Sequence, residues 1–507
     1  MIYNFDLGIG WASSGVEYAQ LYRCRIFREL GEPARFVFTD MFPQENIQHY
    51  TSNLGFRDDE VIWLYTFFTD QKIAPVTYTL EDFEKTLADQ DFRFNRTGRT
   101  GRLVFNGGGD FCTLYFVDEN CNRLHRVEYV SGGFLIRKDY FTRGRLYTEY
   151  YAPLDGKAHL YMRRFFNTDG TTAYEEYLDG QEPVYRFPDE ILFSKEELVG
   201  YMTRRMNMTG DDVAIIDRTT GIGQAILENC GDARTGIVVH ADHYSAGNTT
   251  DDYILWNNYY EYSFRMYRHI SFFITSTDAQ RDLMREQFLK YVGEAPAICT
   301  IPVGSLEKLT YPETGAGTCE GRRPFSIVTA SRLASEKHLD WVIRACVIAR
   351  EKFPELTLDI YGAGGEYNSL RDLIKENQAG GYIRLMGQHD MSDVYRNYEL
   401  YLSGSTSEGF GLSLMEAVGS GLPIIGFDVP YGDPTFISDG ENGYLIPVTD
   451  EMSVNDHVEA LARAVEKFFT HSGDGRRAFR EKSYQVASEY LTEKVMRRWE
   501  RLLAGEI

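Results

Sequence analysis

Short apolar runs alternate with helical segments in two separate parts of the chain. In the first part, Ile2–Phe5 and Ala34–Thr39 flank a helical segment at Val16–Leu30, and the same texture returns at Asp212–Asp217 and Gly236–His240. Apolar runs of this kind are typical of parallel strands that are buried on both faces and connected through helices. This part of the sequence therefore predicts a doubly wound α/β domain.

The second part repeats the pattern closer to the C-terminus. Apolar runs at Phe325–Ala330, Leu356–Tyr361 and Tyr382–Met386 accompany a helical segment at Leu339–Lys352. Two Rossmann-like halves of this kind imply a ligand in the cleft between them. We expect the last helical segment, Ala487–Leu503, to cross back and brace the first half.

Between about residues 77 and 187 the texture changes to short runs rich in Tyr, Phe, Val and Leu. Turn signals recur about every ten residues, at 106–109, 118–120, 131–133, 155–156, 169–170 and 179–180. This spacing predicts an inserted antiparallel β-meander, close to neutral in charge. Its aromatic residues, such as Tyr147, Tyr150 and Tyr151, are interpreted either as packing on both faces of the sheet or as a partner surface.

These patterns predict four parts. Residues 1–76 and 188–304 form an N-terminal, acceptor-side domain; residues 77–187 form the meander; residues 305–486 form a C-terminal nucleotide-sugar domain; and residues 487–507 form a C-terminal helix.

Composition excludes several functional classes. A formal net charge of -22 disfavours nucleic acid and other phosphate polymers as partners. The seven cysteines are odd in number and have no C-x-x-C spacing, so the sequence suggests neither a disulfide framework nor a zinc site, and a reducing compartment is favoured. The N-terminus lacks a signal-peptide pattern and no apolar stretch is long enough to span a bilayer, so we expect a cytoplasmic protein.

The segment Ser407–Ala417 places Glu408 and Glu416 on either side of a glycine-rich turn. A strand-like run at Glu399–Ser403 precedes it and a helix is predicted from Leu412, so both carboxylates can face one cleft. Alternatively, Glu408 is a helix-capping acid and Glu416 an exposed helical residue.

The loop between Gly8 and Gly15 leads into the first helix and can offer backbone N–H groups to a phosphate. A dinucleotide fingerprint would need glycine where Ser13 stands, so a nicotinamide cofactor is disfavoured. A tight turn without a ligand remains an alternative.

His240 and His243 follow a predicted buried strand, at its carboxyl end. Their spacing matches no familiar metal-ligand pattern, so a metal site is not expected. Local sequence does not decide which of the two histidines would face a ligand.

Four segments of the C-terminal half together resemble a known family. Ser331–Lys337, Tyr361–Gly364, the Glu408/Glu416 pair and Phe436–Leu445 occur in the order found in the retaining, GT-B-fold glycosyltransferases of family 4. The inserted meander and the opening Asn4–Glu17 are similar to bacterial protein and teichoic-acid N-acetylglucosaminyltransferases, among them the enzymes of the accessory Sec system.

The resemblance implies a role for each candidate residue. Arg332 and Lys337 would stabilise the leaving diphosphate without a metal, Glu416 would accept the ribose hydroxyls of UDP, and Glu408 would meet the donor sugar. The remaining implied donor contacts are Gly15, Val16, Glu17 and Tyr18 at the diphosphate, Gln388 and His389 at the base, Gly409, Phe410, Gly411 and Leu412 beside the sugar, and the active-site histidine, His240 or His243.

The resemblance also implies an activity. We expect a UDP-GlcNAc-dependent transferase that modifies Ser/Thr of a serine-rich repeat adhesin before export, with no metal or other cofactor. The alternatives are transfer to wall teichoic acid and a non-catalytic subunit that stabilises the substrate. A second, homologous glycosyltransferase-like subunit is expected to dock through the meander, and the complex is expected at the inner face of the cell membrane.

Overall fold

The structure is a computed structural model that describes residues 1–9, 15–87, 90–105, 109–312, 321–449 and 451–506. The chain divides into two compact units. The first comprises Met1–Val238 and Asn258–Ser271, and the second comprises Val239–Asn257 and Phe272–Ile507. Residues 239–257 and 272–304, which the sequence predicts in the N-terminal domain, fall in the second unit.

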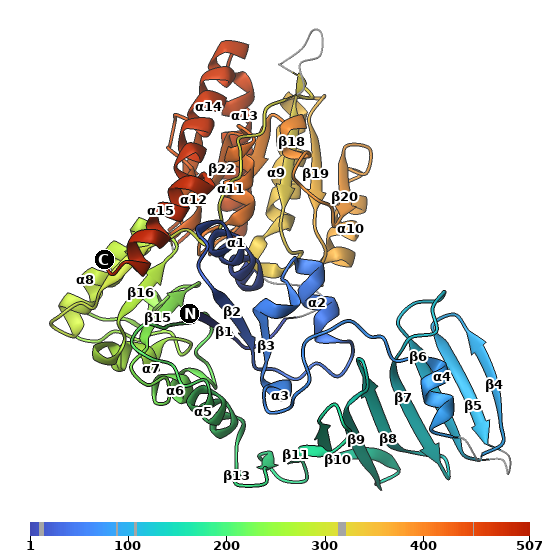
Figure 1. Ribbon diagram of the computed structural model, residues 1–507. Helices are drawn as coiled ribbons and strands as arrows, with labels where there is room; N and C mark the ends of the chain where they lie inside the picture. The colour runs from blue at the N-terminus through green and yellow to red at the C-terminus, as the bar shows by residue number, and fades with distance from the viewer. Residues whose placement is uncertain (10–14, 88–89, 106–108, 313–320, 450, 507) are drawn as a thin grey trace. The chain divides into compact units, whose positions relative to one another are not determined.

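The first unit contains parallel strands in the order β15-β14-β1-β2-β3 (Figure 1). Their bounds are β1 (Ile2–Asp6), β2 (Ala34–Phe38), β3 (Val61–Trp63), β14 (Val213–Ile216) and β15 (Arg234–Val239). The helices of the first unit are α1 (Gly15–Leu30), α2 (Ile47–Leu54), η1 (Asp58–Glu60), α3 (Leu64–Phe67), α4 (Leu80–Lys85), α5 (Lys195–Arg205), α6 (Gly223–Leu227), α7 (Glu261–Arg265) and η3 (Tyr267–His269), of which α4 packs on the inserted antiparallel sheet. The predicted doubly wound arrangement is confirmed.

A buried ion pair fixes helix α1 against this sheet. The guanidinium of Arg23 donates to both carboxylate oxygens of Asp217, at 2.7 and 3.0 Å, and to the side-chain oxygen of Asn4 at 2.9 Å. Arg23 is 4% exposed, and Asp217 directly follows β14. Because a bidentate arginine has a fixed geometry, the pair orients the helix on which Gly15–Tyr18 lie.

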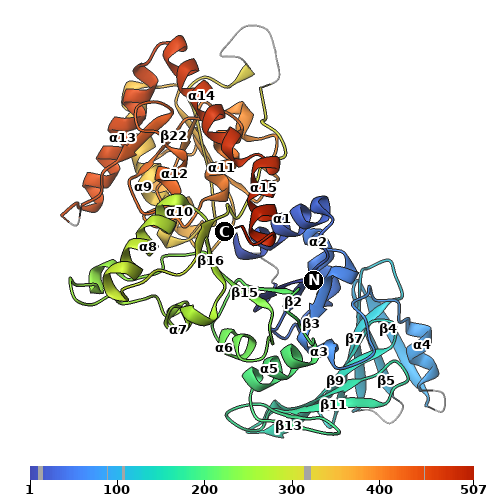
Figure 2. The same ribbon diagram turned by 60° about the vertical axis from the view of Figure 1, so that its left-hand side comes forward.

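The predicted meander is a ten-stranded antiparallel sheet in which the strands follow one another from β4 to β13 (Figure 2). Their bounds are β4 (Phe92–Thr97), β5 (Thr100–Phe105), β6 (Phe111–Phe116), β7 (Leu124–Ser131), β8 (Phe134–Phe141), β9 (Arg145–Leu154), β10 (Lys157–Phe166), β11 (Thr172–Tyr177), β12 (Val184–Arg186) and β13 (Ile191–Leu192). The predicted turns at 131–133, 155–156 and 169–170 each separate two strands. Positive φ angles at Gly132, Gly133, Gly156 and Gly170 explain why those turns need glycine. The turn predicted at 106–109 lies largely outside the described residues.

A ladder of aromatic rings joins this sheet to the α/β part of the first unit. Ring centroids lie 4.2 Å apart for Tyr140 and Tyr147, and 4.5 Å apart for Phe165 and Tyr174. At the end of the ladder, the hydroxyl of Tyr174 donates to the backbone oxygen of Tyr65, at 2.8 Å. Tyr147 is 2% exposed, so packing is the correct interpretation for this residue.

Charged side chains are also buried within the meander. Arg163 donates to Glu149 at 2.9 Å and to Glu176 at 3.0 Å, and both carboxylates are almost fully buried. Burial favours the neutral form of ionisable groups, but the two carboxylates hold Arg163 charged and raise its pKa. The three side chains therefore depend on one another.

We expect Arg163→Ala to lower the free energy of unfolding by about 3 kcal/mol, because it leaves two buried carboxylates without their cation. Arg164→Ala is the matched control. Arg164 pairs with Glu175 at 2.7 Å but is 34% exposed, and its loss should cost less than about 1 kcal/mol. Chemical denaturation of both variants measures the difference, and equal losses would contradict the expectation.

The second unit contains a six-stranded parallel sheet in the order β20-β19-β18-β21-β22-β23. Its strands are β18 (Ser326–Ala330), β19 (Thr357–Tyr361), β20 (Ile383–Gly387), β21 (Leu400–Leu402), β22 (Ile424–Phe427) and β23 (Gly443–Ile446). Two further parallel strands, β16 (Phe272–Thr275) and β17 (Ile298–Thr300), pair with each other in this unit.

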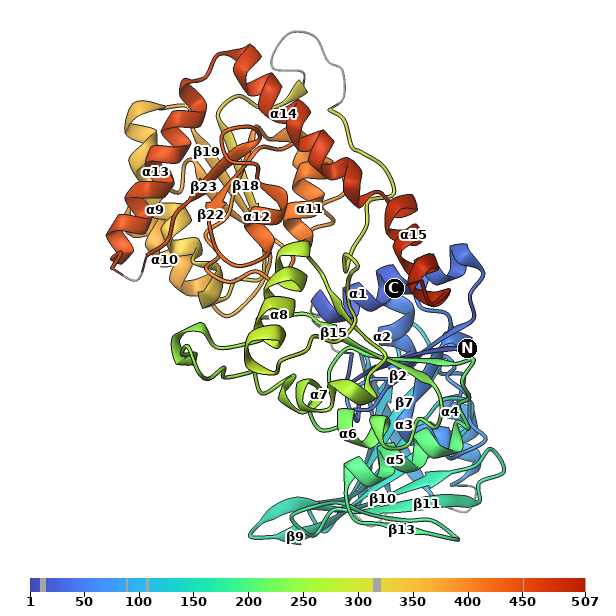
Figure 3. The same ribbon diagram turned by 90° about the vertical axis from the view of Figure 1, so that its left-hand side faces the viewer.

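Helices cover both faces of the six-stranded sheet (Figure 3). Ile327, Ile360 and Ile425 pack on one face among residues of α9, α10 and α13, whereas their neighbours Val328 and Ile424 pack on the other face with α11 and α12. The helices of this unit are η2 (Ala246–Asn248), α8 (Asp278–Tyr291), η5 (Ser335–Lys337), α9 (Leu339–Lys352), α10 (Tyr367–Glu376), η6 (Tyr395–Asn397), α11 (Leu412–Gly419), α12 (Gly432–Phe436), α13 (Val454–Thr470), α14 (Gly473–Ala487), η7 (Ser488–Tyr490) and α15 (Thr492–Leu503).

The helix predicted at 487–503 is interrupted. Leu491 has an extended backbone between η7 and α15 and pairs with Leu306 in an isolated bridge. The backbone N–H of Thr492 donates to the oxygen of Leu306 at 2.9 Å, so a tertiary contact takes the place of a helical hydrogen bond.

Among the described residues, no helix has both the length and the apolar character that a membrane span requires. The six cysteines in the described ranges are free thiols.

Candidate donor site

The predicted site residues of the second unit lie on loops that follow its parallel strands. Lys337 comes after β18, Gln388 after β20, and Glu408 after β21. Because parallel strands end at the same edge of a sheet, these loops converge there. The predicted clustering of these loops is therefore a consequence of the observed topology.

Two glycines shape the loop that carries Glu408. A Cβ atom at Gly409 would lie 2.3 Å from the backbone oxygen of His240, so only glycine permits this close approach. Gly411 has a φ of 87° and directly precedes α11, as predicted for a glycine-rich turn before a helix. Phe410, by contrast, is 4% exposed and packs on Phe436, so only its backbone can serve a ligand. Leu412 is the first residue of α11 and is partly buried.

Lys337 and Glu408 form an ion pair, with Nζ 2.5 Å from Oε2. Their side chains are 15% and 21% exposed, so the pair is partly shielded from water. The backbone oxygen of Glu408 accepts from the N–H of Gly432 at 2.7 Å. Tyr431, at a φ of 80°, turns the chain so that this contact can form. The structure thus joins two residues for which the sequence predicted separate contacts.

Asp433 lies beside this pair and was not predicted from the sequence. It is fully buried, and burial together with the negative charge of Glu408 raises the pKa of its carboxyl group. Its signal in the sequence is weak, because a single aspartate has no distinctive spacing relative to the other candidate residues.

Glu416 lies on α11, as predicted. Burial raises the pKa of its carboxyl group to about 7, and Asp390 adds to the rise, while a hydrogen bond from Tyr395 opposes it. Asp390 directly follows Gln388 and His389, both of which are exposed. The structure therefore brings the predicted base-reading loop close to the predicted ribose ligand.

Arg332 stands apart from the other residues of the site. It is 70% exposed and pairs with Glu336 at 2.9 Å, within its own loop. The glycines of the segment Tyr361–Gly364 support this loop, because a Cβ at Gly362 would lie 1.9 Å from the backbone oxygen of Ser331. In the described interactions Arg332 does not contact Lys337 or Glu408.

The structure distinguishes the two histidines. His243 has no exposed surface; its Nε2 donates to Gln287 at 2.7 Å, and its Nδ1 accepts from the hydroxyl of Tyr431 at 3.1 Å. Burial lowers the pKa of the ring to about 4, so it is neutral. His240 is partly exposed at the end of β15. Only His240 is thus accessible to a ligand, which sequence alone did not decide.

The first unit holds the remaining predicted residues, at the start of α1. Gly15 is exposed and Tyr18 is 39% exposed, whereas Glu17 is 8% exposed. Glu17 is one of the acids that raise the pKa of buried Asp6 to about 8, after burial itself and Asp217. The loop before Gly15, including Ser13, lies outside the described residues. Val16 is partly buried within the same first turn.

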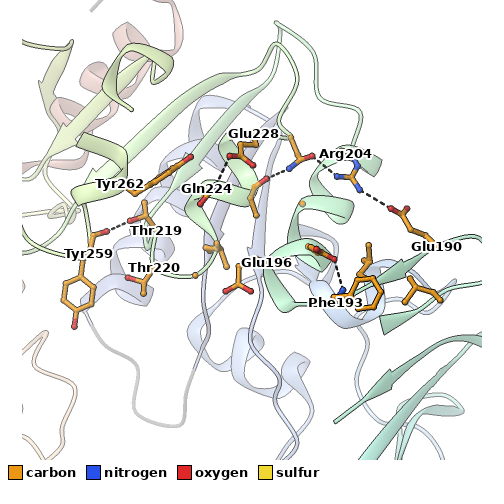
Figure 4. Close-up of a pocket in the computed structure, with 18 of the residues that line it drawn as sticks. Glu190, Phe193, Glu196, Arg204, Thr219, Thr220, Gln224, Glu228, Tyr259 and Tyr262 are labelled. Atoms are coloured by element: carbon orange, nitrogen blue, oxygen red, sulfur yellow. Dashed lines mark hydrogen bonds and ion pairs between the residues drawn. The ribbon is translucent and has the colours of Figure 1, made fainter. Parts of the chain in front are cut away.

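The first unit also has an open pocket of about 1020 Å³ between α5 and α6, which we call the α5–α6 pocket (Figure 4). Its labelled lining residues are Glu190, Phe193, Glu196, Arg204, Thr219, Thr220, Gln224, Glu228, Tyr259 and Tyr262. Phe193 and Tyr259 are 63% and 60% exposed, and Arg204 is held by Asn229 at 2.9 Å and by Glu190 at 3.6 Å. None of the predicted donor-site residues lines this pocket.

Within the described ranges, no three His, Cys, Asp or Glu side chains are grouped as a metal ion would require.

Two doubly wound sheets with an antiparallel sheet inserted in the N-terminal half define the class of GT-B glycosyltransferases. Comparison with known families agrees: residues 93–189 match the GtfA extended beta-sheet domain, and residues 320–486 match glycosyl transferases group 1.

Comparison with individual proteins identifies the family within this class. The chain is 51% identical to the UDP-N-acetylglucosamine--peptide N-acetylglucosaminyltransferase GtfA subunit of Streptococcus gordonii, over 99% of this chain and 98% of that protein. A crystal structure of the pneumococcal O-GlcNAc transferase GtfA in complex with UDP and GlcNAc superposes with a TM-score of 0.92, at 47% identity, over 99% of this chain and 98% of that one. The crystal structure of a GtfA/B complex superposes with a TM-score of 0.93 at 50% identity, over 100% of this chain and 99% of that chain. The chain belongs to the GtfA family.

We expect Gly409→Ala to lower the free energy of unfolding by about 1 to 3 kcal/mol, because the added methyl group overlaps the backbone oxygen of His240. Gly365→Ala is the control, since a Cβ there meets nothing within 4 Å, and it should change stability by less than about 0.5 kcal/mol. Thermal or chemical unfolding of both variants tests this, and a fully stable Gly409→Ala protein would contradict it.

Proposed function

We propose that this chain transfers GlcNAc from UDP-GlcNAc to Ser and Thr residues of a polypeptide, with retention of configuration. The observation that supports this most strongly is identity of 51% across nearly the whole chain to a GtfA subunit named for that reaction. The pneumococcal GtfA structure contains both UDP and GlcNAc. Lys337 and Glu408 lie on segments that follow two strands of one parallel sheet, and Glu416 lies on the helix α11 after the second of them, which supports a donor site at these positions.

The donor would be held by groups from several loops. Lys337 supplies a point charge for the diphosphate, and Glu416 accepts the ribose hydroxyls. Gln388 and His389, which directly precede Asp390 in sequence, would contact the base. Arg332 would have to leave Glu336 to reach the diphosphate, which its exposure permits.

The donor sugar would lie beside Glu408 and the backbone from Gly409 to Leu412. His240 is the active-site histidine in this proposal, because His243 is buried and both of its ring nitrogens are bonded. The first turn of α1, Gly15 to Tyr18, contributes backbone N–H groups to the diphosphate.

The reaction would proceed without a metal, since Lys337 and Arg332 supply positive charge to the leaving group. The leaving phosphate itself would take the proton of the acceptor hydroxyl, so no second carboxylate base is required. This route is consistent with retention of configuration.

The acceptor is proposed to be a serine-rich repeat adhesin, modified before export. An open pocket of about 1020 Å³ with exposed Phe193 and Tyr259 in the first unit suits a macromolecular acceptor better than a small one. The net charge of -22 disfavours wall teichoic acid, a polyphosphate, as the alternative acceptor. A non-catalytic role is disfavoured because the charged donor-site residues are retained.

A GtfB-type subunit is the proposed partner, as in the GtfA/B complex. The inserted sheet supports docking through this domain because Phe134 and Ile136 of β8 are 38% and 41% exposed, two positions apart on one face. The complex is proposed to act in the cytoplasm, peripherally at the inner face of the cell membrane.

We expect Lys337→Ala to lower turnover about a hundredfold, because one preorganised charge on the leaving diphosphate is lost. The assay uses UDP-GlcNAc and a Ser-rich peptide in EDTA, with product masses identifying the transferred sugar. Exposed Lys352, which pairs with Glu466, is the control, and Lys352→Ala should retain normal turnover. Normal turnover of folded Lys337→Ala, or loss of wild-type activity in EDTA, would refute the corresponding part of the proposal.

The double variant Phe134→Ser, Ile136→Ser should weaken binding of the partner subunit at least about tenfold, because it removes apolar side chains that the interface would bury. Its own unfolding should change little, since both side chains are partly exposed. Leu289→Ser, at a 52% exposed position of α8, is the control. Analytical ultracentrifugation with the partner measures both, and unchanged affinity of the double variant would contradict docking through this face.

A further inference from the structure

Asp433 is an unusual carboxylic acid. It belongs to α12, is fully buried, and neither of its carboxyl oxygens makes a hydrogen bond of good geometry in the described part of the chain. Buried carboxylates are normally paired or hydrogen bonded, so an exception calls for a physical explanation.

The fold makes a specific space for this side chain. A Cβ at Gly426 would lie 2.1 Å from Oδ1 of Asp433, and a Cβ at Gly432 would lie 2.5 Å from Cγ of Glu408. Two glycines thus allow the carboxyl group of Asp433 and the side chain of Glu408 to occupy neighbouring positions. The arrangement is built by the packing of β22 and α12, which contact each other.

The charges of this group do not balance if every member is ionised. Lys337 is one cation, and it already pairs with Glu408 at 2.5 Å. A charged Asp433 would be a second buried carboxylate without a cation of its own, which is energetically unfavourable. Burial and then Glu408 raise its pKa to about 7, against smaller opposing effects of Ser403 and Lys337.

Helices α11 and α14 also pack on α12, and they carry other charged groups. Glu416 lies on α11 with Tyr395 as its partner, and Arg480 is buried on α14. Lys482, also on α14, pairs with Glu441. The charges that act on Asp433 directly are those of Glu408 and Lys337.

We propose that Asp433 is a positioning residue that holds a proton beside the Lys337–Glu408 pair and couples this proton to binding of the donor's diphosphate. This inference rests on the proposed function, because it takes Lys337 to be the contact of the diphosphate. The consequence for regulation is that the protein takes up a proton from solvent when it binds the donor.

The direction of the effect follows from electrostatics. A bound diphosphate adds negative charge and draws Lys337 away from the carboxylates, so both changes favour the protonated form of Asp433. Where Asp433 is partly ionised in the free protein, binding of the donor takes up a proton. The affinity for UDP therefore falls as the pH rises above about 7.

The test is calorimetric titration of the full chain with UDP, in two buffers of different ionisation enthalpy near neutral pH. Wild type should take up a fraction of a proton and bind UDP about tenfold more weakly two pH units above neutral, whereas Asp433→Asn should change less than about twofold. Asp428→Asn, an exposed aspartate just after β22, is the matched control and should behave as wild type.

The outcomes separate this inference from the proposed function. A wild-type protein that does not bind UDP contradicts the proposed donor site. If UDP binds with equal proton uptake in wild type and Asp433→Asn, Asp433 does not take up the proton and its proposed role is overturned, even if Glu416 takes up a proton in both proteins. If Asp433→Asn does not fold, Asp433→Ser is titrated in its place, and wild-type affinity that does not vary with pH also overturns the inference.

Discussion

The contact between Lys337 and Glu408 is the interaction on which the donor site depends. It joins the loop after β18 to the loop after β21, and these loops are also in close backbone contact, because a Cβ at Gly404 would lie 2.9 Å from the backbone oxygen of Lys337. The backbone oxygen of Glu408 also accepts a hydrogen bond from the N–H of Gly432, the first residue of α12. One ion pair, two glycines and a strained Tyr431 thus assemble a site from segments nearly a hundred residues apart.

This assembly has an electrostatic consequence. In a buried environment one cation can neutralise only one of two neighbouring carboxylates. The second carboxylate must then be protonated or must pair with another cation or hydrogen-bond donor. In the second unit burial is the largest cause of the raised pKa of both Glu416 and Asp433, and a neighbouring carboxylate adds to it in each: Asp390 for Glu416 and Glu408 for Asp433. Perturbed acids of this kind gather where a protein binds or transforms a charged ligand.

The inserted sheet is held by a different kind of interaction. Aromatic rings from successive strands pack from Tyr140 to Tyr174 and continue into the α/β part of the first unit, so the sheet shares a core with that part. Partly buried Arg163 is paired with Glu149 and Glu176 within the sheet itself. Phe134 and Ile136 are among the exposed apolar side chains of this sheet, and neither belongs to the aromatic ladder or to the Arg163 cluster.

Local pattern was sufficient to predict several of the elements and the order of the domains. The helix at Leu339–Lys352 has the predicted bounds, the turn at Gly409–Gly411 leads into α11, and the meander follows its glycine turns, because period and turn chemistry are properties of neighbouring residues. Tertiary structure alone decided which side chains meet: His243 is buried and His240 is accessible, Arg332 pairs within its own loop, and Asp433 lies against Glu408. These outcomes depend on packing between segments distant in sequence, and burial, which determines the charge of each group, exists only after the chain has folded.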